Sequence, residues 1–264
     1  MTALRVAAVQ YAAGADPIIN AACALDGVAE AAAAGARVVV LPEYSIAWAP
    51  ALYPELAGGY QEFESTLASA AAEHGVYVVA GSLRPQGGRL LNVAVVFGPD
   101  GAERASYAKV HLFDAFGVQE SKVLDAGPPG VAAVVDIDGW RLGLATCYDL
   151  RFPETFRLLV DAGAQVFAVG AAWAAGPGKE EQLLLLARAR ALENTSYLIL
   201  ASQSGAGRCG RSLIAGPLGQ ELAAATSETS VTITDLDPDQ LARVREQVPS
   251  LRHRRYSVVA RPAQ

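Results

Sequence analysis

Short apolar segments alternate along this chain with longer segments in which apolar and small residues recur at helical spacing. A short continuous apolar run is typical of a buried strand, and a longer run with apolar residues three and four positions apart is typical of an amphipathic helix. The pattern predicts strands at 6–10, 37–41, 76–82, 90–97, 102–108, 131–137, 141–146, 165–169, 197–201, 212–215, 220–224 and 231–235. It predicts helices at 17–34, 60–74, 153–161, 179–194 and 238–247.

The order of these elements indicates the architecture. Strands and helices alternate, but hairpins interrupt the alternation, which implies an α/β protein with two mixed sheets and helices outside them. Gly35 and Gly75 stand where the first two helices are expected to end. No Gly/Pro-rich stretch is long enough to divide the chain, so residues 1–264 are expected to form a single domain, with 251–264 as a C-terminal tail.

Composition limits the classes of partner. Hydrophobic residues make up 52% of the chain and charged residues 18%, enough for a sizeable core. The net charge of −6 argues against nucleic acid, because phosphate binding needs clustered Lys and Arg. No apolar run approaches the roughly 18 residues of a membrane helix, and no secretory signal is evident. We therefore expect a soluble, cytoplasmic protein that binds neither nucleic acid nor membrane.

The cysteines point to one candidate nucleophile. Cys23, Cys147 and Cys209 form no CxxC pair and no metal-ligand spacing, so we expect no metal site and assign no role to Cys23 or Cys209. Cys147 closes the apolar run 141–146 and precedes a predicted turn into a helix. Backbone N–H groups at such a turn favour negative charge, which suits a reactive thiol. A small core residue is the alternative interpretation of Cys147.

A thiol nucleophile needs a base or a lowered pKa. Glu43 ends a fully apolar strand and fits a partly desolvated carboxylate base, although alone it also fits a solvated loop residue. Lys109 follows the strand 102–108 and would stabilise a thiolate and an oxyanion, but alone it also fits an exposed edge lysine. His111 is expected to share the face of Lys109 and is the alternative partner of Cys147. Jointly these residues favour a Glu–Lys–Cys hydrolase.

Three segments carry a family resemblance, namely Leu41-Pro-Glu43, Tyr107-Ala-Lys109-Val-His-Leu-Phe113 and Cys147-Tyr-Asp-Leu-Arg-Phe-Pro-Glu154. Their residues, their order along the chain and their separation in the sequence are similar to those of the signature segments of the nitrilase superfamily of carbon–nitrogen hydrolases. The resemblance runs from Val6 to about Leu251. It implies a four-layer α-β-β-α sandwich that assembles as a homodimer or a higher homo-oligomer.

The resemblance also implies roles for individual residues. Glu43 matches the general base, Lys109 the oxyanion-stabilising lysine and Cys147 the nucleophile. Glu120 matches a further glutamate that orients the lysine or the substrate amide, whereas its position alone indicates a surface residue. The backbone N–H of Tyr148 would be the second oxyanion donor. The implied reaction of a small-molecule amide with water passes through a cysteine thioester, releases ammonia and needs no metal or organic cofactor.

The residues after the cysteine indicate a branch of the superfamily. Cys-Tyr-Asp-Leu-Arg-Phe-Pro-Glu is similar to the omega-amidases and deaminated glutathione amidases, whereas nitrilases tend to show Cys-Trp-Glu and carbamoylases Cys-Asn-Asp-Arg-Arg-x-Pro-Glu. A nitrilase and an N-carbamoyl amidohydrolase remain the alternatives. Only eight residues separate His111 from Glu120, fewer than in typical omega-amidases, and Gln182-Leu183 stand where those enzymes often carry His-Trp. Both differences bear on the shape of the substrate pocket.

Four more side chains are candidates for the site or its support. Trp173 follows the strand 165–169, so we expect it at the same rim as Cys147, in contact with substrate or packed in the core. Arg188 and Arg190 are expected to be buried ion-pair partners, for Glu154 or Glu193. Arg151 could meet a substrate carboxylate or bond to its own turn.

Two non-hydrolytic interpretations are weaker. A protein that keeps the fold without activity would lack a member of the triad, yet Glu43, Lys109 and Cys147 are all present. A thiol-redox protein would need a resolving cysteine near Cys147, and none is close in the sequence.

Overall fold

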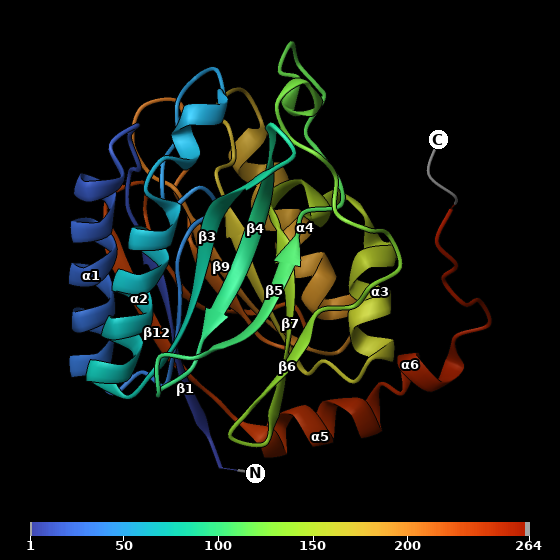
Figure 1. Ribbon diagram of the computed structural model, residues 1–264. Coiled ribbons are helices and arrows are strands. Elements are labelled where there is room, and N and C mark those ends of the chain that lie inside the picture. Colours follow the sequence, from blue (N-terminus) through green and yellow to red (C-terminus); the bar gives the residue numbers. More distant parts are fainter. Residues whose placement is uncertain (1, 262–264) are drawn as a thin grey trace.

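The computed structural model describes residues 2–261 and contains two six-stranded sheets that pack face to face (Figure 1). The first sheet has the order β12 (Ser230–Leu236), β1 (Leu4–Gln10), β2 (Val38–Val40), β3 (Tyr77–Gln86), β4 (Arg89–Phe97) and β5 (Glu103–Ala108). The second has the order β11 (Glu221–Ala224), β10 (Leu213–Ala215), β9 (Tyr197–Ser202), β8 (Val166–Ala171), β7 (Trp140–Thr146) and β6 (Val134–Ile137). In each sheet three neighbouring strands are parallel, β1–β2–β3 and β7–β8–β9, and the other pairings are antiparallel.

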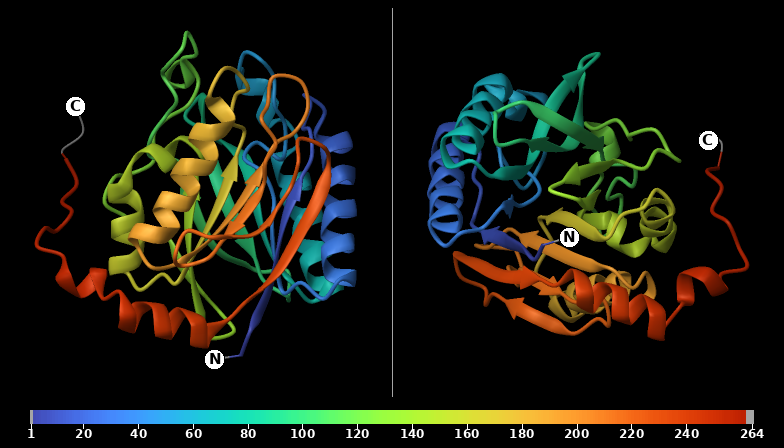
Figure 2. Two further views of the ribbon diagram at one scale, coloured as in Figure 1. Left: turned by 180° about the vertical axis from the view of Figure 1, so that it is seen from behind. Right: turned by 90° about the horizontal axis from the view of Figure 1, so that it is seen from below.

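Helices cover the outer face of each sheet, as the views from behind and below show (Figure 2). The helices are α1 (Pro17–Ala33) and α2 (Tyr60–His74) on the first sheet, α3 (Pro153–Asp161) and α4 (Lys179–Glu193) on the second, then α5 (Pro238–Gln247) and α6 (Ser250–His253). Short 3-10 helices are η1 (Pro54–Ala57), η2 (Glu120–Lys122) and η3 (Cys147–Arg151). The predicted α-β-β-α sandwich is confirmed. None of the helices in residues 2–261 is long and apolar enough to cross a membrane.

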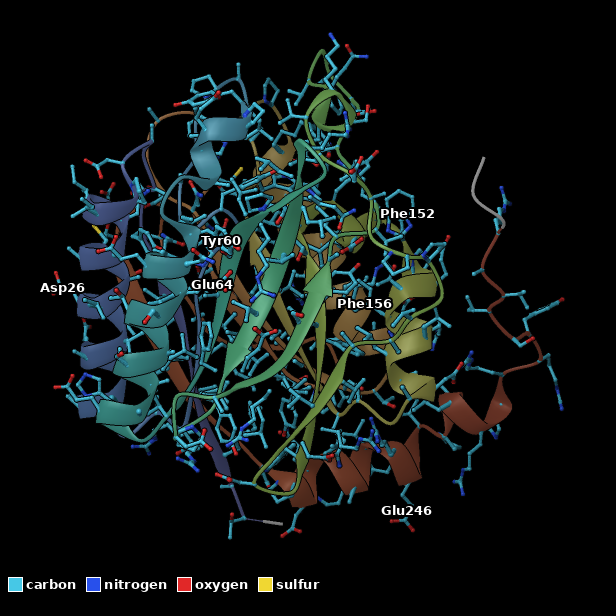
Figure 3. All side chains as sticks on the ribbon, in the orientation of Figure 1. Asp26, Tyr60, Glu64, Phe152, Phe156 and Glu246 are labelled. Atoms are coloured by element: carbon cyan, nitrogen blue, oxygen red, sulfur yellow. The ribbon has the colours of Figure 1, made fainter. Side chains whose placement is uncertain are left out.

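Three apolar clusters of the described residues fill the spaces between the layers. Val28 and Leu67 belong to the cluster under α1 and α2, and Val40 belongs to the cluster between the sheets. Phe156 of α3 packs edge-on against Phe167 of β8, with ring centroids 5.1 Å apart. Figure 3 shows Phe156 pointing inward, whereas Asp26 and Glu246 point to solvent. The alternation of apolar and polar positions along the chain therefore corresponds to these layers.

The element boundaries follow the predicted ones closely, with three larger differences. β3 continues to Gln86, four residues beyond the strand predicted to end at residue 82. The ladder between β6 and β7 begins at Val134, so the strand predicted from residue 131 starts three residues later. The predicted tail begins with the short helix α6, and Arg254 then forms an ion pair with Asp161 of α3. Residues 1 and 262–264 of the predicted domain and tail lie outside the described residues. The single domain, the cytoplasmic location and the homo-oligomer stay predictions.

Candidate active site

The candidate residues emerge at one end of the two sheets. Glu43 follows β2 and Cys147 follows β7, at the carboxyl ends of parallel strands. Lys109 follows β5, which runs in the same direction as β3 because each is antiparallel to β4. The carboxyl ends of parallel strands are where α/β proteins bind ligands, because the chain leaves the sheet there. The fold thus brings residues more than 100 positions apart in the sequence to one place.

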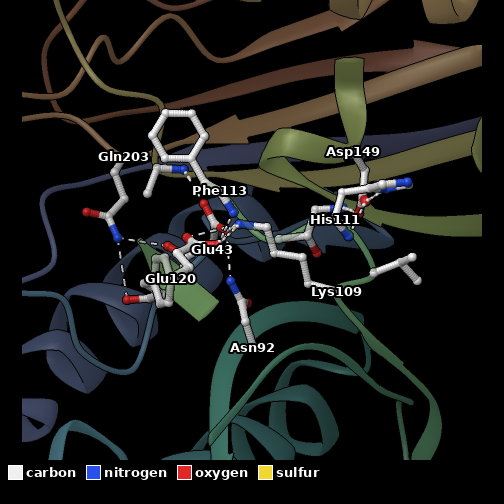
Figure 4. Close-up of polar contacts among 12 residues, drawn as sticks. Glu43, Asn92, Lys109, His111, Phe113, Glu120, Asp149 and Gln203 are labelled. Atoms are coloured by element: carbon white, nitrogen blue, oxygen red, sulfur yellow. Dashed lines mark hydrogen bonds and ion pairs between the residues drawn. The ribbon is translucent and has the colours of Figure 1, made fainter. Parts of the chain in front are cut away.

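Glu43 is buried and its carboxylate is held on both oxygens (Figure 4). Oε1 accepts hydrogen bonds from Lys109 Nζ and from Asn92 Nδ2, both at 2.8 Å. Oε2 accepts a hydrogen bond from the Ala172 N–H at 2.9 Å. Gln203 Nε2 donates to the Glu43 carbonyl at 2.8 Å and so fixes the backbone. These bonds offset the cost of burying the carboxylate and define its orientation.

Two glycines make room for the turn that carries Glu43. A Cβ on Gly81 of β3 would lie 2.5 Å from the Pro42 carbonyl oxygen, and one on Gly170 of β8 would lie 2.8 Å from the Glu43 nitrogen. Neither distance is compatible with a side chain, so each sheet contributes a glycine where the backbones approach closely.

Lys109 is buried between two carboxylates. Its Nζ lies 2.8 Å from Glu43 Oε1 and 2.9 Å from Glu120 Oε2. Burial lowers the pKa of Lys109, but the charges of Glu120 and Glu43 together outweigh burial and hold the pKa well above its usual value. Lys109 is therefore an ammonium ion.

Glu120 is buried in η2, although its position in the sequence alone predicts a surface residue. It accepts hydrogen bonds from the Tyr44 hydroxyl and from the Phe113 N–H, both at 2.7 Å. Burial raises the pKa of Glu120, but the charge of Lys109 and these hydrogen bonds bring it below its usual value. Glu120 is therefore ionised, and the prediction from position alone is wrong because a buried cation pairs with it.

Cys147 begins η3 with a φ of 45°, in the left-handed region that non-glycine residues seldom adopt. Burial raises the pKa of the Cys147 thiol well above its usual value, and the charge of Glu43 raises it further, while Lys109 acts in the opposite direction. The thiol is therefore protonated at neutral pH and needs a base to become a nucleophile. Backbone strain of this kind occurs at functional turns, where the surrounding structure holds it in place.

Asp149 fixes the turn that follows Cys147. It is fully buried and accepts hydrogen bonds from the Thr146 N–H at 2.9 Å and from the Tyr107 hydroxyl at 2.8 Å. His111 Nδ1 lies 2.6 Å from Asp149 Oδ1, and the His111 ring stacks on Phe152 at 3.7 Å. The expectation that His111 shares the face of Lys109 is wrong, because β5 ends at Ala108 and the alternation stops there. His111 pairs with Asp149 and supports the turn.

We expect Asp149→Asn to destabilise the protein by about 2–3 kcal/mol and to lower turnover, because an amide cannot accept from all of these donors. Urea denaturation followed by circular dichroism measures the first effect, and an activity assay the second. Asp136→Asn is the matched control, because Asp136 lies in neighbouring β6 with an exposed side chain. Equal stability of the two variants would contradict the supporting role of Asp149.

A cavity of about 480 Å³ opens beside Cys147. Glu43 and Glu120 line it, and Trp173 forms part of its wall. Its other walls include residues 48–52, the loop 113–123 with Phe113 and Val118, and the side chains of Lys179 and Arg208. The short loop between His111 and Glu120 therefore borders the cavity, as the sequence predicts.

Trp173 lies at the predicted rim, and its Nε1 donates to the Lys179 carbonyl at 3.0 Å. Tyr148 packs its ring edge-on against Phe113 and Phe152, and its N–H lies in the first turn of η3, where N–H groups have no partner within the helix.

The arginines differ from one another. Arg190 is buried and pairs with Glu193 at 2.9 Å, as predicted. Arg188 is exposed and donates to the Gly219 carbonyl at 2.6 Å, so the prediction of a buried ion pair is wrong for it. Arg151 bonds to Gln182 Oε1 of α4 at 2.7 Å instead of to its own turn. Among residues 2–261, no group of three or more His, Cys, Asp or Glu side chains could hold a metal ion.

Comparison with known proteins gives the family. The model of the family described as carbon-nitrogen hydrolase matches residues 5–246. The chain is 37% identical over 268 residues to hydrolase Rv0480c of Mycobacterium tuberculosis, covering 95% of each protein. It is 33% identical to human omega-amidase NIT2 over 275 residues, covering 98% of each. The NitN amidase of Nesterenkonia sp. AN1 superposes with a TM-score of 0.83 at 28% identity and 96% coverage of both chains.

These similarities confirm the predicted resemblance to the nitrilase superfamily and to its omega-amidase branch. The matched region includes every candidate residue from Glu43 to Trp173. The chain belongs to the carbon-nitrogen hydrolase family and is an enzyme of the amidase type.

Proposed function

We propose that the protein hydrolyses a small carboxamide to a carboxylic acid and ammonia, with Cys147 as nucleophile, Glu43 as general base and Lys109 as oxyanion stabiliser. The observation that carries this proposal is the convergence of the three side chains: Lys109 Nζ lies 2.8 Å from Glu43 Oε1, and Glu43 and Cys147 line one cavity. A thiol, a carboxylate and a fixed ammonium ion beside a cavity are the groups that acyl transfer requires.

In the first half of the reaction, Glu43 takes the proton of Cys147 and the thiolate attacks the amide carbonyl carbon. Glu43 Oε2 accepts the Ala172 N–H and retains a lone pair for that proton. The carbonyl oxygen becomes an oxyanion. Protonated Glu43 then gives its proton to the amide nitrogen, the C–N bond breaks, and ammonia leaves a Cys147 thioester.

Lys109 and the Tyr148 N–H stabilise the oxyanion. The Lys109 ammonium group donates to Glu43 Oε1 at 2.8 Å and to both Glu120 oxygens, at 2.9 and 3.1 Å, and the substrate oxygen would take the place of the longer bond to Glu120. Glu120 holds Lys109 in this orientation. Such donors fixed before the reaction act strongly in a buried site, because no reorganisation accompanies the development of charge.

In the second half, Glu43 removes a proton from water and the hydroxide attacks the thioester carbonyl. The C–S bond breaks, the acid is released, and the proton returns to Cys147. One solved structure of the Nesterenkonia amidase shows covalent addition of the acetamide moiety of fluoroacetamide at the active site cysteine. That adduct, on a similar protein, supports a cysteine nucleophile here.

We expect the protein to release ammonia from amides in a small panel of substrates. The panel contains 2-oxoglutaramate, succinamate, deaminated glutathione, a simple aliphatic amide, an aliphatic nitrile and an N-carbamoyl amino acid. Coupled detection of ammonia with purified protein ranks them by kcat/KM. Turnover of the nitrile alone, or of the carbamoyl compound alone, would contradict the amidase proposal and place the protein in another branch of the family.

A further inference from the structure

Arg208 is a cation at the cavity for which residues 2–261 supply no counter-ion. It lines the cavity together with Cys147 and Glu43, and it is half-buried. Among residues 2–261 its guanidinium donates only to the Gly207 carbonyl, at 3.0 Å from Nη1, while its Nε is buried with no hydrogen-bond partner. No carboxylate of the described residues lies within ion-pair distance of it. A partly desolvated guanidinium with unused N–H groups is costly unless something binds there.

The guanidinium is held in place from two sides. Arg208 CZ lies 3.8 Å from the centroid of the Trp48 ring, so the planar group stacks on the indole. Its backbone is fixed by a bridge to Ala174, with the Cys209 N–H donating to the Trp173 carbonyl at 3.0 Å. A positioned guanidinium loses little conformational entropy when it binds, which suits a recognition group.

The balance of charge at the cavity favours an anion. Glu43 and Glu120, the carboxylates that line it, are both already paired with Lys109. The cations that line it are Lys122, Lys179 and Arg208, so positive charge is in excess there even though the whole chain carries −6. Lys179 Nζ lies 3.4 Å from the centroid of the Phe116 ring and has no ion pair with a described residue. Burial lowers the pKa of Arg208, as expected for a cation that lacks a close carboxylate.

We propose that Arg208, stacked on Trp48, binds a carboxylate at the end of the substrate remote from the amide and so selects anionic amides. Arg151, the residue that the sequence suggested for this task, bonds to Gln182 and lies over Trp173, 5.0 Å from the ring centroid. The planar guanidinium of Arg208 still has N–H groups for a carboxylate. This inference rests on the proposed amidase function.

The test compares succinamate with butanamide, in which a methyl group replaces the carboxylate. We expect Arg208→Gln to lower kcat/KM for succinamate about 10- to 100-fold, mainly through KM, because a charged hydrogen bond is lost. The value for butanamide should change less than about twofold, and Arg208→Lys should restore part of the loss for succinamate. Arg243→Gln is the charge-matched control, because Arg243 lies on α5 and pairs with exposed Asp237.

Equal losses for both substrates, or no loss for succinamate, would overturn the role of Arg208 and leave the amidase proposal intact. If the wild type hydrolyses neither compound, succinate binding to Cys147→Ala is measured by calorimetry, with and without Arg208→Gln. A Kd at least about tenfold weaker in the double variant supports the carboxylate site independently of turnover. An unchanged Kd, or no binding of succinate to Cys147→Ala, overturns it.

Discussion

Replacement of Cys147 by alanine is expected to abolish turnover and to leave the fold intact. The nucleophile is lost, and no second thiol lines the cavity in the described part of the chain. Loss of a nucleophile typically lowers kcat by roughly a thousandfold or more, because the remaining groups cannot form the covalent intermediate. Only one sulfur atom is removed, so the free energy of unfolding should change by about 1 kcal/mol or less.

Ammonia release per protein molecule measures the first effect, and urea denaturation measures the second. Cys23→Ala is the matched control, since Cys23 is a half-buried free cysteine on α1, on the outer face of the first sheet. The control should keep wild-type turnover. Turnover near wild type in Cys147→Ala itself would end the thioester mechanism.

The strand ends that carry Glu43 and Cys147 could be predicted from the sequence because each follows an apolar run that marks a buried strand, whereas Lys109 follows β5, a largely exposed edge strand without such a run. Such a run fixes where the chain leaves the sheet, and it does not depend on which strands are neighbours. The family resemblance then supplied the expected roles, including that of Glu120, which no local pattern indicates.

The partners of these residues could not be predicted, because they come from pairings between distant strands. Asn92 reaches Glu43 from β4, and Gln203 reaches it from the end of β9. In the sequence Asn92 is only a polar residue inside an apolar run, which signals that it has a buried partner without saying which. The prediction for His111 was wrong for another reason: the sequence pattern does not indicate that β5 ends at Ala108.

Lys109→Ala should lower turnover roughly a hundredfold or more, on the scale of losing an oxyanion donor. It should also lower the free energy of unfolding by about 3–5 kcal/mol, because removal of one partner leaves buried charge uncompensated. Glu43 and Glu120 would both face the space of the lost ammonium group, and Lys109 contributes to the lowered pKa of Glu120. The activity assay and urea denaturation at pH 7 measure the two losses.

If unpaired, buried Glu120 causes the loss of stability in Lys109→Ala, the free energy of unfolding of this variant should rise as the pH falls. Without Lys109, burial raises the pKa of Glu120 above its value in the unfolded chain, so the folded state binds the extra proton and stability rises as the pH falls. The deficit relative to wild type should therefore shrink between pH 7 and pH 5. The stability of the wild type should instead decrease as the pH falls, and only at lower pH. The reason is that the pKa of Glu120 in the folded wild type lies below its value in the unfolded chain.

A double variant separates the structural role of Lys109 from its catalytic one. Lys109→Ala with Glu120→Gln removes one of the two unpaired carboxylates, so it should recover part of the stability at pH 7. It should recover no turnover, since the donor to the oxyanion is still missing. Recovery of turnover together with stability, or an unchanged rate in Lys109→Ala alone, would mean that Lys109 serves only to neutralise the buried carboxylates.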